Sequence, residues 1–221
     1  MTESKNNHSK TGVRFFGEIT ALLSHDLKNV LAIINENAGL LEDFSLMAAG
    51  GNPISPERLG MIAGKIQRQV RRADEMIKRL NRVGHSVDRP LDTVNLAGLV
   101  ETVCALAARK AALKTVSFSI TKPSEPVTVK TDPFALQQLI WVCLDRVIPM
   151  VEASKTVEIA TTSTTSGATI TFGPMEAIRN KPVDTGSESP QKELLRMLNA
   201  DLITDRNHGT LAVELPLKIT A

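Results

Sequence analysis

The sequence predicts an α+β protein in which an N-terminal long helical hairpin forms a dimeric four-helix bundle and a C-terminal α/β sandwich follows. Three observations lead to this fold class. Residues 13–48 contain no proline, and apolar side chains recur along them at three- and four-residue steps, the period of one buried helical stripe. Residues 57–85 repeat this period after a break rich in glycine and proline. Beyond Pro90 the pattern changes to short alternating runs separated by helical ones, which is typical of helices packed on a mostly antiparallel sheet.

The composition narrows the class of protein. The 221 residues are 42% hydrophobic, enough for a packed core, but only 3% aromatic, which argues against a surface that stacks on nucleic-acid bases. The formal net charge of +2 also disfavours a nucleic-acid partner. No apolar run approaches the roughly 18 to 20 residues of a membrane span, and residues 1–12 are polar. We therefore expect a flexible leader on a cytoplasmic protein without a membrane partner. Cys104 and Cys143 stand in apolar contexts, which predicts buried free thiols.

The first domain is predicted to be the helical hairpin, residues 13–86. The buried stripe of its first helix consists of Leu23, Leu27, Val30, Ile34, Asn37, Leu41 and Phe44. Gly50 and Gly51 suit the end of that helix, and Ser55 and Pro56 suit the cap and first turn of the next. The stripe of the second helix consists of Leu59, Ile62, Ile66, Val70, Ala73, Ile77 and Leu80. A single hairpin has nothing to close over its stripe, whereas two hairpins make a four-helix bundle, so we expect a homodimer.

A linker, residues 87–95, is predicted to join the hairpin to the second domain, residues 96–221. The expected helices of this domain lie at 96–113, from 132 onward and at 190–200, and the expected strands at 116–121, 127–131, 156–164, 168–173 and 209–217. Residues 174–190 are rich in loop-forming residues, which predicts a mobile surface loop.

The stretch "LLSHDLKNVLAII", residues 22–34, places polar residues inside an apolar helical run. At about 100° per residue, His25 lies opposite the buried stripe, with Asn29, Ala32 and Glu36 on its own face and Asp26 beside it. On its own, such a histidine is most often a solvated surface residue, and Asp26 and Lys28 alone are ordinary surface charges. Together they make a reactive set: an exposed imidazole nitrogen can attack phosphorus, and a neighbouring carboxylate can fix its tautomer. Lys28 is close enough to offset phosphoryl charge.

The segment "LLSHDLKNVLAIINENAGLLED" resembles the H-box of two-component histidine kinases, in which His-Asp/Glu-x-x-Asn/Thr marks the phosphoacceptor helix. The motif residues here are His25, Asp26 and Asn29. The resemblance implies that His25 carries a phosphoryl group, that Asp26 assists as a base or an orienting group, and that Asn29 positions water for dephosphorylation of a partner.

The second domain resembles the ATP-binding domain of the same family, but its nucleotide motifs are degenerate. The segment "TDPFALQQLIWVCLDRVI" is similar to the N-box helix, whose two asparagines serve nucleotide and magnesium; Val142 and Arg146 stand in their places. A valine does not hydrogen-bond, and an arginine repels a metal ion. An Asp-x-Gly-x-Gly motif is absent after "ITFG", and so is a glycine-rich phosphate loop before residue 191. The resemblance therefore implies a kinase-like fold with no cofactor-binding residues and no metal of its own.

These features match the dimeric, kinase-derived histidine phosphotransferases of bacterial phosphorelays best. We expect phosphoryl transfer from one response-regulator receiver domain to His25 and on to another, with magnesium supplied by the receiver and ATP-dependent kinase activity unlikely to persist. Candidate receiver contacts are Leu22, Ala32, Glu36 and Val83. The basic residues of the second helix have three interpretations. A solvated helix face is preferred, attraction of acidic receiver domains comes second, and nucleic-acid binding comes third. Two alternatives stay open: an active but divergent histidine kinase or phosphatase, and an inert pseudokinase scaffold that binds receivers or kinases.

Overall fold

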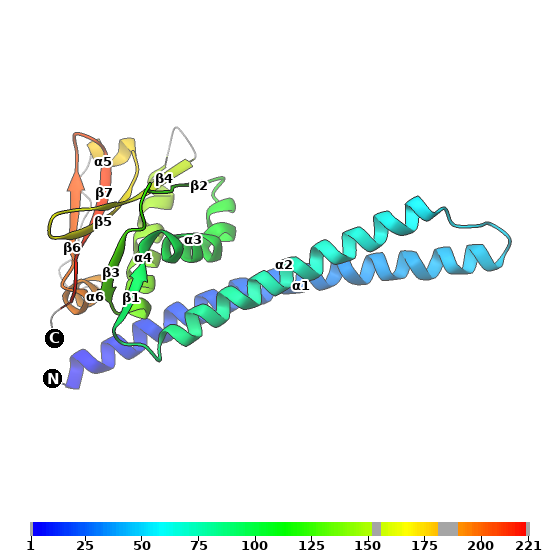
Figure 1. Cartoon of the computed structure of the whole chain (residues 1–221), viewed down its shortest axis with the longest axis horizontal. Coiled ribbons are helices and arrows are strands. Elements are labelled where there is room, and N and C mark those ends of the chain that lie inside the picture. Colours follow the sequence, from blue (N-terminus) through cyan, green and yellow to red (C-terminus); the bar gives the residue numbers. More distant parts are fainter. Residues whose placement is uncertain (1, 152–155, 181–189, 220–221) are drawn as a thin grey trace. The chain divides into compact units, whose positions relative to one another are not determined.

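The fold is taken from a computed structural model, which describes residues 2–151, 156–180 and 190–219. The chain divides into two compact units, one made of Ile19–Arg82 and the other of Met1–Glu18 together with Val83–Ala221. Each unit is described by itself. Figure 1 labels the elements that build them.

The first unit is a helical hairpin, built from most of α1 (Thr2–Ala49) and α2 (Pro56–Ser86). Gly51 ends the turn of the first helix with a φ of 93°, a conformation that glycine adopts without strain. The Ser55 backbone oxygen accepts hydrogen bonds from the amides of Arg58 and Leu59, and Pro56 occupies the first position of α2. The turn residues thus act as the sequence predicts.

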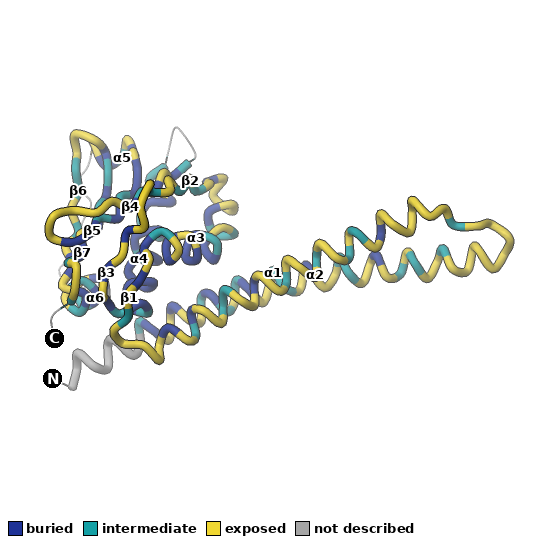
Figure 2. The backbone as a smooth tube through the Cα atoms, in the orientation of Figure 1, coloured by how far each residue is buried: buried dark blue, intermediate teal, exposed yellow. Residues whose placement is uncertain are grey.

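The stripe predicted for α1 is half-buried or buried along its whole length, and Leu23, Val30 and Asn37 are fully buried. In the part of α2 that belongs to the hairpin unit, the buried side chains are Ile62 and Met76, whereas three members of the predicted stripe are exposed. Their exposed fractions are 41% for Leu59, 52% for Val70 and 47% for Ile77. The α2 stripe is therefore wider than the area that α1 of the same chain covers. Figure 2 marks many residues along the hairpin as exposed.

Helix α1 begins at Thr2, earlier than the boundary at residue 13 that the sequence predicts. The first turns belong to the second unit, where Phe15 packs edge-on against the rings of Phe134 and Trp141, at centroid distances of 5.8 and 5.7 Å. Phe15 is 4% exposed.

The second unit is a two-layer α/β sandwich. Its main sheet has five strands in the order β2-β4-β5-β7-β6, and a separate pair is formed by β1 and β3. The strands are β1 (Asp92–Asn95), β2 (Ser117–Thr121), β3 (Thr128–Thr131), β4 (Thr156–Ser163), β5 (Gly167–Phe172), β6 (Asp201–Asp205) and β7 (Thr210–Pro216). Strand β2 runs parallel to β4, and the other neighbours in the main sheet are antiparallel.

Helices α3 (Leu96–Ala112), α4 (Pro133–Val147) and α6 (Pro190–Leu198) form the helical layer. Asn95 caps α3 by accepting a hydrogen bond from the Gly98 amide at 3.0 Å, and Asp132 caps α4 by accepting from the amides of Phe134 and Ala135, both at 2.9 Å. The core between the layers consists of fully buried side chains that include Leu136, Leu139, Ile140, Leu144, Ile159, Ile170, Phe172 and Val213.

No element is predicted from the sequence at β1, at β6 or at α5 (Glu176–Asn180). The helix predicted over 132–150 ends as α4 at Val147, and a short 3₁₀ turn, Ile148–Met150, follows it. Helix α5 falls in the predicted loop 174–190, and its Ile178 is fully buried; residues 181–189 of that loop lie outside the described residues. Within the described ranges, no helix is both long and apolar enough to cross a membrane.

Candidate functional site

His25 lies on α1 with 55% of its side chain exposed. The buried side chains Ile19, Leu23 and Val30 occupy the other side of the helix, whereas Asn29, Ala32 and Glu36 are exposed on the histidine's face. The exposure follows from helical phase alone, because residues four apart share one face and His25 is out of step with the apolar stripe. An imidazole in this position is open to a large partner.

The Nδ1 atom of His25 has two polar neighbours on the same helix. The side-chain nitrogen of Asn29, one turn later, is 3.2 Å from Nδ1, and the Asp26 carboxylate is 3.8 Å from it. The first distance is that of a hydrogen bond and the second is that of an ion pair when the ring is protonated. Asp26 is 20% exposed, so its carboxylate is partly shielded from water.

Which ring nitrogen can act as a nucleophile depends on the tautomer. If the Asn29 amide nitrogen donates to Nδ1, the proton of a neutral ring is on Nε2, which then lacks an available lone pair. Rotating the amide by half a turn lets its oxygen accept from Nδ1–H instead, and Nε2 then carries the lone pair. The orientation of the Asn29 amide and the tautomer of the His25 ring therefore go together.

The remaining predicted residues of this site differ in exposure. Lys28, Ala32 and Glu36 are exposed, and Leu22 is half-buried. Val83 is 0% exposed, because it is packed into the interior near the end of α2, so its side chain does not offer a surface to a partner.

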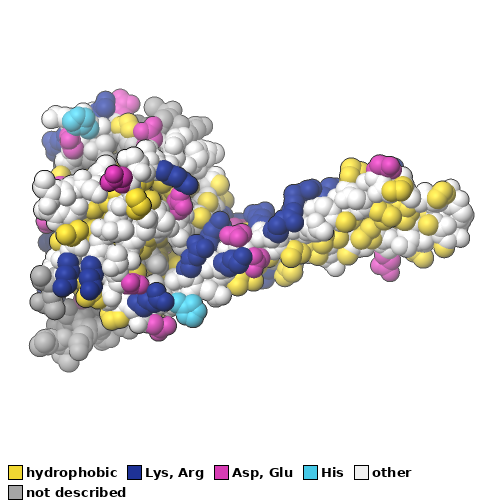
Figure 3. Space-filling view, in the orientation of Figure 1, with side chains coloured by type: hydrophobic (Ala, Val, Ile, Leu, Met, Phe, Trp, Pro, Cys, Tyr) yellow, Lys and Arg dark blue, Asp and Glu magenta, His cyan; other side chains and the backbone are white. Residues whose placement is uncertain are grey.

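Helix α2 carries a set of basic side chains, Arg68, Arg71, Arg72, Lys78, Arg79 and Arg82, which Figure 3 shows in dark blue along the hairpin. Lys78 is bound to Asp74 at 2.7 Å and lies 3.8 Å from Glu75, and the Asp74 hydrogen bond raises the pKa of this lysine. The arginines give this helix a positive surface.

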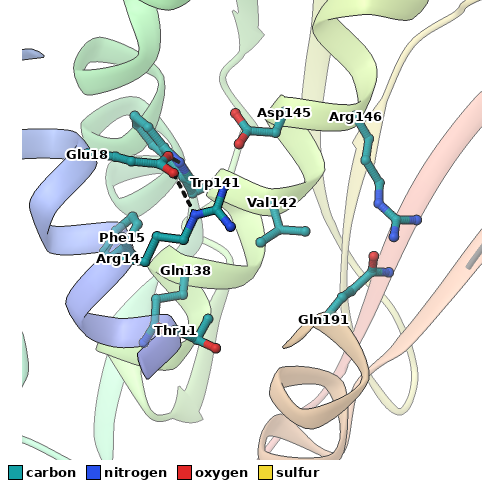
Figure 4. A pocket seen from close by; sticks show the side chains of 10 residues that line it. All are labelled: Thr11, Arg14, Phe15, Glu18, Gln138, Trp141, Val142, Asp145, Arg146 and Gln191. Atoms are coloured by element: carbon teal, nitrogen blue, oxygen red, sulfur yellow. Dashed lines mark hydrogen bonds and ion pairs between the residues drawn. The ribbon is translucent and has the colours of Figure 1, made fainter. Parts of the chain in front are cut away.

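The two degenerate N-box positions lie in the second unit. Val142 and Arg146 are one turn apart on α4, both are half-buried, and both line the same cavity of about 270 Å³. Figure 4 shows their side chains together with those of Thr11, Arg14, Phe15 and Glu18 from α1 and Gln191 from α6. The resemblance to the N-box thus selects two positions that line one cavity, whereas no motif in the sequence marks Arg14, Phe15 or Glu18 of α1 as its other wall.

A polar network ties α1 to this cavity. The Trp141 ring nitrogen donates to Glu18 at 3.0 Å, and Arg14 binds the other oxygen of the same carboxylate at 3.0 Å. Burial raises the pKa of the Glu18 carboxyl, but these hydrogen bonds and the charge of Lys110 together outweigh burial, so its pKa lies below the ordinary value. Lys110 also binds Asp145 and lies over the Trp141 ring, 5.3 Å from its centroid.

The two cysteines are part of the packed interior. Cys104 and Cys143 are buried, as the sequence predicts, and burial raises the pKa of both thiols to about 12. Among the described residues, no group of three or more His, Cys, Asp or Glu side chains is placed to hold a metal ion.

Comparisons with known proteins find similarity in structure alone. The catalytic domain of the histidine kinase ThkA has 14% sequence identity and a TM-score of 0.46, over 59% of this chain and 99% of that domain. The Acinetobacter baumannii histidine kinase AdeS has 11% identity and a TM-score of 0.46, over 87% of this chain and 98% of that chain. ThkA in complex with the response regulator protein TrrA has 17% identity and a TM-score of 0.44, over 97% of this chain and 65% of that chain.

A scan of family models and a search of curated proteins both find no match to the chain. Because the three structural matches have identities below 25% and TM-scores below 0.5, nothing about the activity of this chain follows from them.

Proposed function

We propose that the chain is a histidine phosphotransferase of a bacterial phosphorelay, which accepts a phosphoryl group on His25 from one receiver domain and passes it to another. The observation that carries the proposal is the exposed imidazole whose Nδ1 lies 3.2 Å from Asn29 and 3.8 Å from Asp26. A solvated histidine without a role needs no such pair of neighbours. The valine and arginine at positions 142 and 146 argue against ATP as the phosphoryl source.

In the proposed reaction, the Nε2 lone pair of neutral His25 attacks the phosphorus of a receiver's aspartyl phosphate in line. The N–P bond forms as the P–O bond to the aspartate breaks, and the receiver carboxylate leaves with the bonding electron pair. The proton on Nδ1 stays there, so the phosphorylated ring is a cation that the Asp26 carboxylate stabilises. Transfer to the second receiver reverses these steps, with the carboxylate of that receiver as the nucleophile.

Most of the catalysis in this proposal is positioning and charge neutralisation. Lys28 offsets part of the phosphoryl charge from a neighbouring position on the helix surface. The proposal assigns the magnesium ion to the receiver, so this chain contributes the nucleophile and its orienting groups.

The receiver is proposed to dock on the His25 face of the hairpin, where Ala32 and Glu36 are exposed and Leu22 is half-buried. The arginines of α2 would then speed the encounter with an acidic receiver surface, an effect that falls as salt is added.

We further propose that two hairpins associate into a four-helix bundle. Leu59, Val70 and Ile77 lie on one side of α2, eleven and seven residues apart, and each is between 41% and 52% exposed in the single chain. Spacings of seven and eleven residues return a helix to nearly the same face. A second copy that brings the same stripe would cover these side chains in a closed, two-fold arrangement.

The test is a paired labelling experiment on the full chain. The protein is incubated first with labelled ATP and magnesium, and then with a receiver domain that carries a labelled phosphoryl group, and label stable to base but not to acid is measured on the chain. We expect label from the receiver and none from ATP. His25→Ala should abolish labelling, whereas His85→Ala, a control at a histidine that is 79% exposed on α2, should leave it unchanged.

Each other result has a definite meaning. Label from ATP alone would identify an active kinase, and label from neither source across several receivers would favour the scaffold alternative. If His25→Ala abolishes dimerisation as well as labelling, His25 is a structural residue and the assignment fails.

A further inference from the structure

The second unit contains a cavity that the proposed phosphotransfer does not use. It has a volume of about 270 Å³ and is enclosed by the first turns of α1, by α4 and by the start of α6. Typical pockets for small molecules begin at about 300 Å³, and one liquid water takes up about 30 Å³. The cavity is therefore large for a single water and suits a molecule of metabolite size.

Two buried amide side chains line this cavity and have polar atoms without a hydrogen-bond partner in the described part of the chain. Gln138 and Gln191 are each 1% exposed. Both polar atoms of the Gln191 amide are unpaired, and so is the oxygen of Gln138, whose nitrogen donates to the Phe134 carbonyl at 3.4 Å. A buried polar atom without a partner costs about 1 to 3 kcal/mol, so native folds rarely keep three such atoms around one space without a use.

The walls divide into an apolar and a polar part. Phe15 and Trp141 are 4% and 3% exposed, and together with Val142 they form an apolar side. Across from them, the Arg146 side chain on α4 and the Gln191 side chain on α6 are directed toward each other, as Figure 4 shows. An occupant therefore meets rings on one side and amide and guanidinium groups on the other.

The charges around the cavity favour an anion. Glu18 is bound by Arg14 at 3.0 Å, and Asp145 is bound by Lys110, so both acidic groups already have cationic partners. Arg146 lines the cavity with a guanidinium group whose five N–H donors can serve more than one acceptor, and the start of α6 adds the positive end of a helix dipole. The Gln138 oxygen and the Gln191 oxygen, in contrast, need an N–H or O–H donor.

We propose that this cavity binds a small hydroxy- or amino-carboxylate with an apolar body. Its carboxylate meets Arg146 and the Gln191 amide nitrogen, and its apolar part packs on Phe15 and Trp141. An amino group donates to both glutamine oxygens, so an amino-carboxylate satisfies all three unpaired atoms at once, whereas a hydroxyl, with one O–H, donates to one of the two oxygens. The inference does not depend on phosphotransfer, because no step of it uses His25.

The test measures binding of 3-phenyllactate to the full-length protein by isothermal titration calorimetry. Two matched compounds separate the contributions: 3-phenylpropionate lacks the hydroxyl donor, and 2-phenylethanol lacks the carboxylate. We expect 3-phenyllactate to bind at least about tenfold more tightly than either, which corresponds to one lost hydrogen bond or charge contact.

Two variants test whether the Gln191 side chain binds the ligand or only supports the fold. Gln191→Leu should weaken 3-phenyllactate binding by about tenfold or more and raise the melting temperature of the free protein, because it removes an unpaired buried amide without changing the size of the side chain much. Gln137→Leu is the control, since Gln137 is 5% exposed on the same helix as Gln138 but accepts a hydrogen bond from Ser86 and does not line the cavity. It should lower the melting temperature and leave binding unchanged.

Several outcomes would overturn the proposal. One is that neither 3-phenyllactate nor phenylalanine binds; another is that binding is equal for the compound without a hydroxyl or is unaffected by Gln191→Leu. Binding of inorganic phosphate or magnesium-ATP that Gln191→Leu abolishes would assign the cavity to phosphate groups instead.

Discussion

Replacing Asn29 with alanine tests how the structure activates the imidazole. The substitution removes the amide that lies 3.2 Å from the Nδ1 atom of His25 and leaves the Asp26 carboxylate, at 3.8 Å. We expect slower phosphoryl transfer from a receiver to His25, because the rotated Asn29 amide, whose oxygen accepts from Nδ1–H, no longer favours the tautomer that has its lone pair on Nε2. The fold should be unaffected, since Asn29 is exposed and alanine is the better helix former.

The expected magnitude follows from the geometry. A hydrogen bond between neutral groups has a net value of about 0.5 to 1.5 kcal/mol, and each 1.36 kcal/mol corresponds to about a factor of ten in rate. Asn29→Ala should therefore reduce the transfer rate constant by about 2- to 12-fold. This is far less than the complete loss expected for His25→Ala, because Asn29 orients the nucleophile and does not form the bond to phosphorus.

The assay is a single-turnover transfer from a labelled receiver in excess, quenched at short times and repeated between pH 6 and pH 9. Asn35→Ala is the matched control, because it removes an exposed asparagine from the same helix. Its rate constant should equal that of the unmodified protein at every pH.

The reasoning would be refuted by an unchanged transfer rate constant in Asn29→Ala. If, in addition, dephosphorylation of the receiver is lost, Asn29 positions a water molecule and does not orient the ring. A loss as complete as that of His25→Ala would also contradict the estimate, since one exposed hydrogen bond is too weak to produce it.

Three further predictions concern assembly and stability. Ile77→Glu should convert a dimer into a monomer with unchanged helix content, as measured by analytical ultracentrifugation and circular dichroism, because Ile77 is 47% exposed in the single chain. Both thiols should resist a thiol-specific reagent at pH 8 until the protein is unfolded: with a pKa of about 12, only about one thiol in ten thousand is ionised at that pH. Rapid reaction of either native thiol would contradict their burial. The Glu18 carboxyl has a lowered pKa in the folded state, so its contribution to stability is fully present above its ordinary pKa of 4.5 and disappears as the pH falls through the folded value. Glu18→Gln should therefore lower the free energy of unfolding more at pH 7 than at pH 3, and an equal loss at both values would show that ionisation is not involved.

Elements with a strong internal period were predictable from the sequence. The second helix was expected at 57–85 and runs from Pro56 to Ser86, and the helix expected at 96–113 runs from Leu96 to Ala112. Their caps and apolar spacing are local features, so the order of residues is sufficient to specify them. The exposed face of His25 was predictable for the same reason, since helical phase alone sets it opposite the apolar stripe.

Elements that depend on a distant partner were missed. Strand β1 spans only Asp92–Asn95 and exists because it pairs with β3, and β6 pairs with β7 without an alternating pattern strong enough to be recognised. The start of α1 also differs from the prediction. Its first residues have the composition of a leader, but they continue the helix on which Phe15 packs against α4.

The sequence by itself determined the helical hairpin, the α/β sandwich, the exposed imidazole and the absence of the two N-box asparagines, because period, capping residues and motif identity are properties of neighbouring positions. Only the tertiary structure decided that Asn29 lies within hydrogen-bonding distance of Nδ1, that Val83 is buried, and that residues from α1, α4 and α6 enclose a cavity with unpaired amides. Side-chain distances and enclosed spaces depend on how segments far apart in the chain pack together, and that information is not contained in any local pattern.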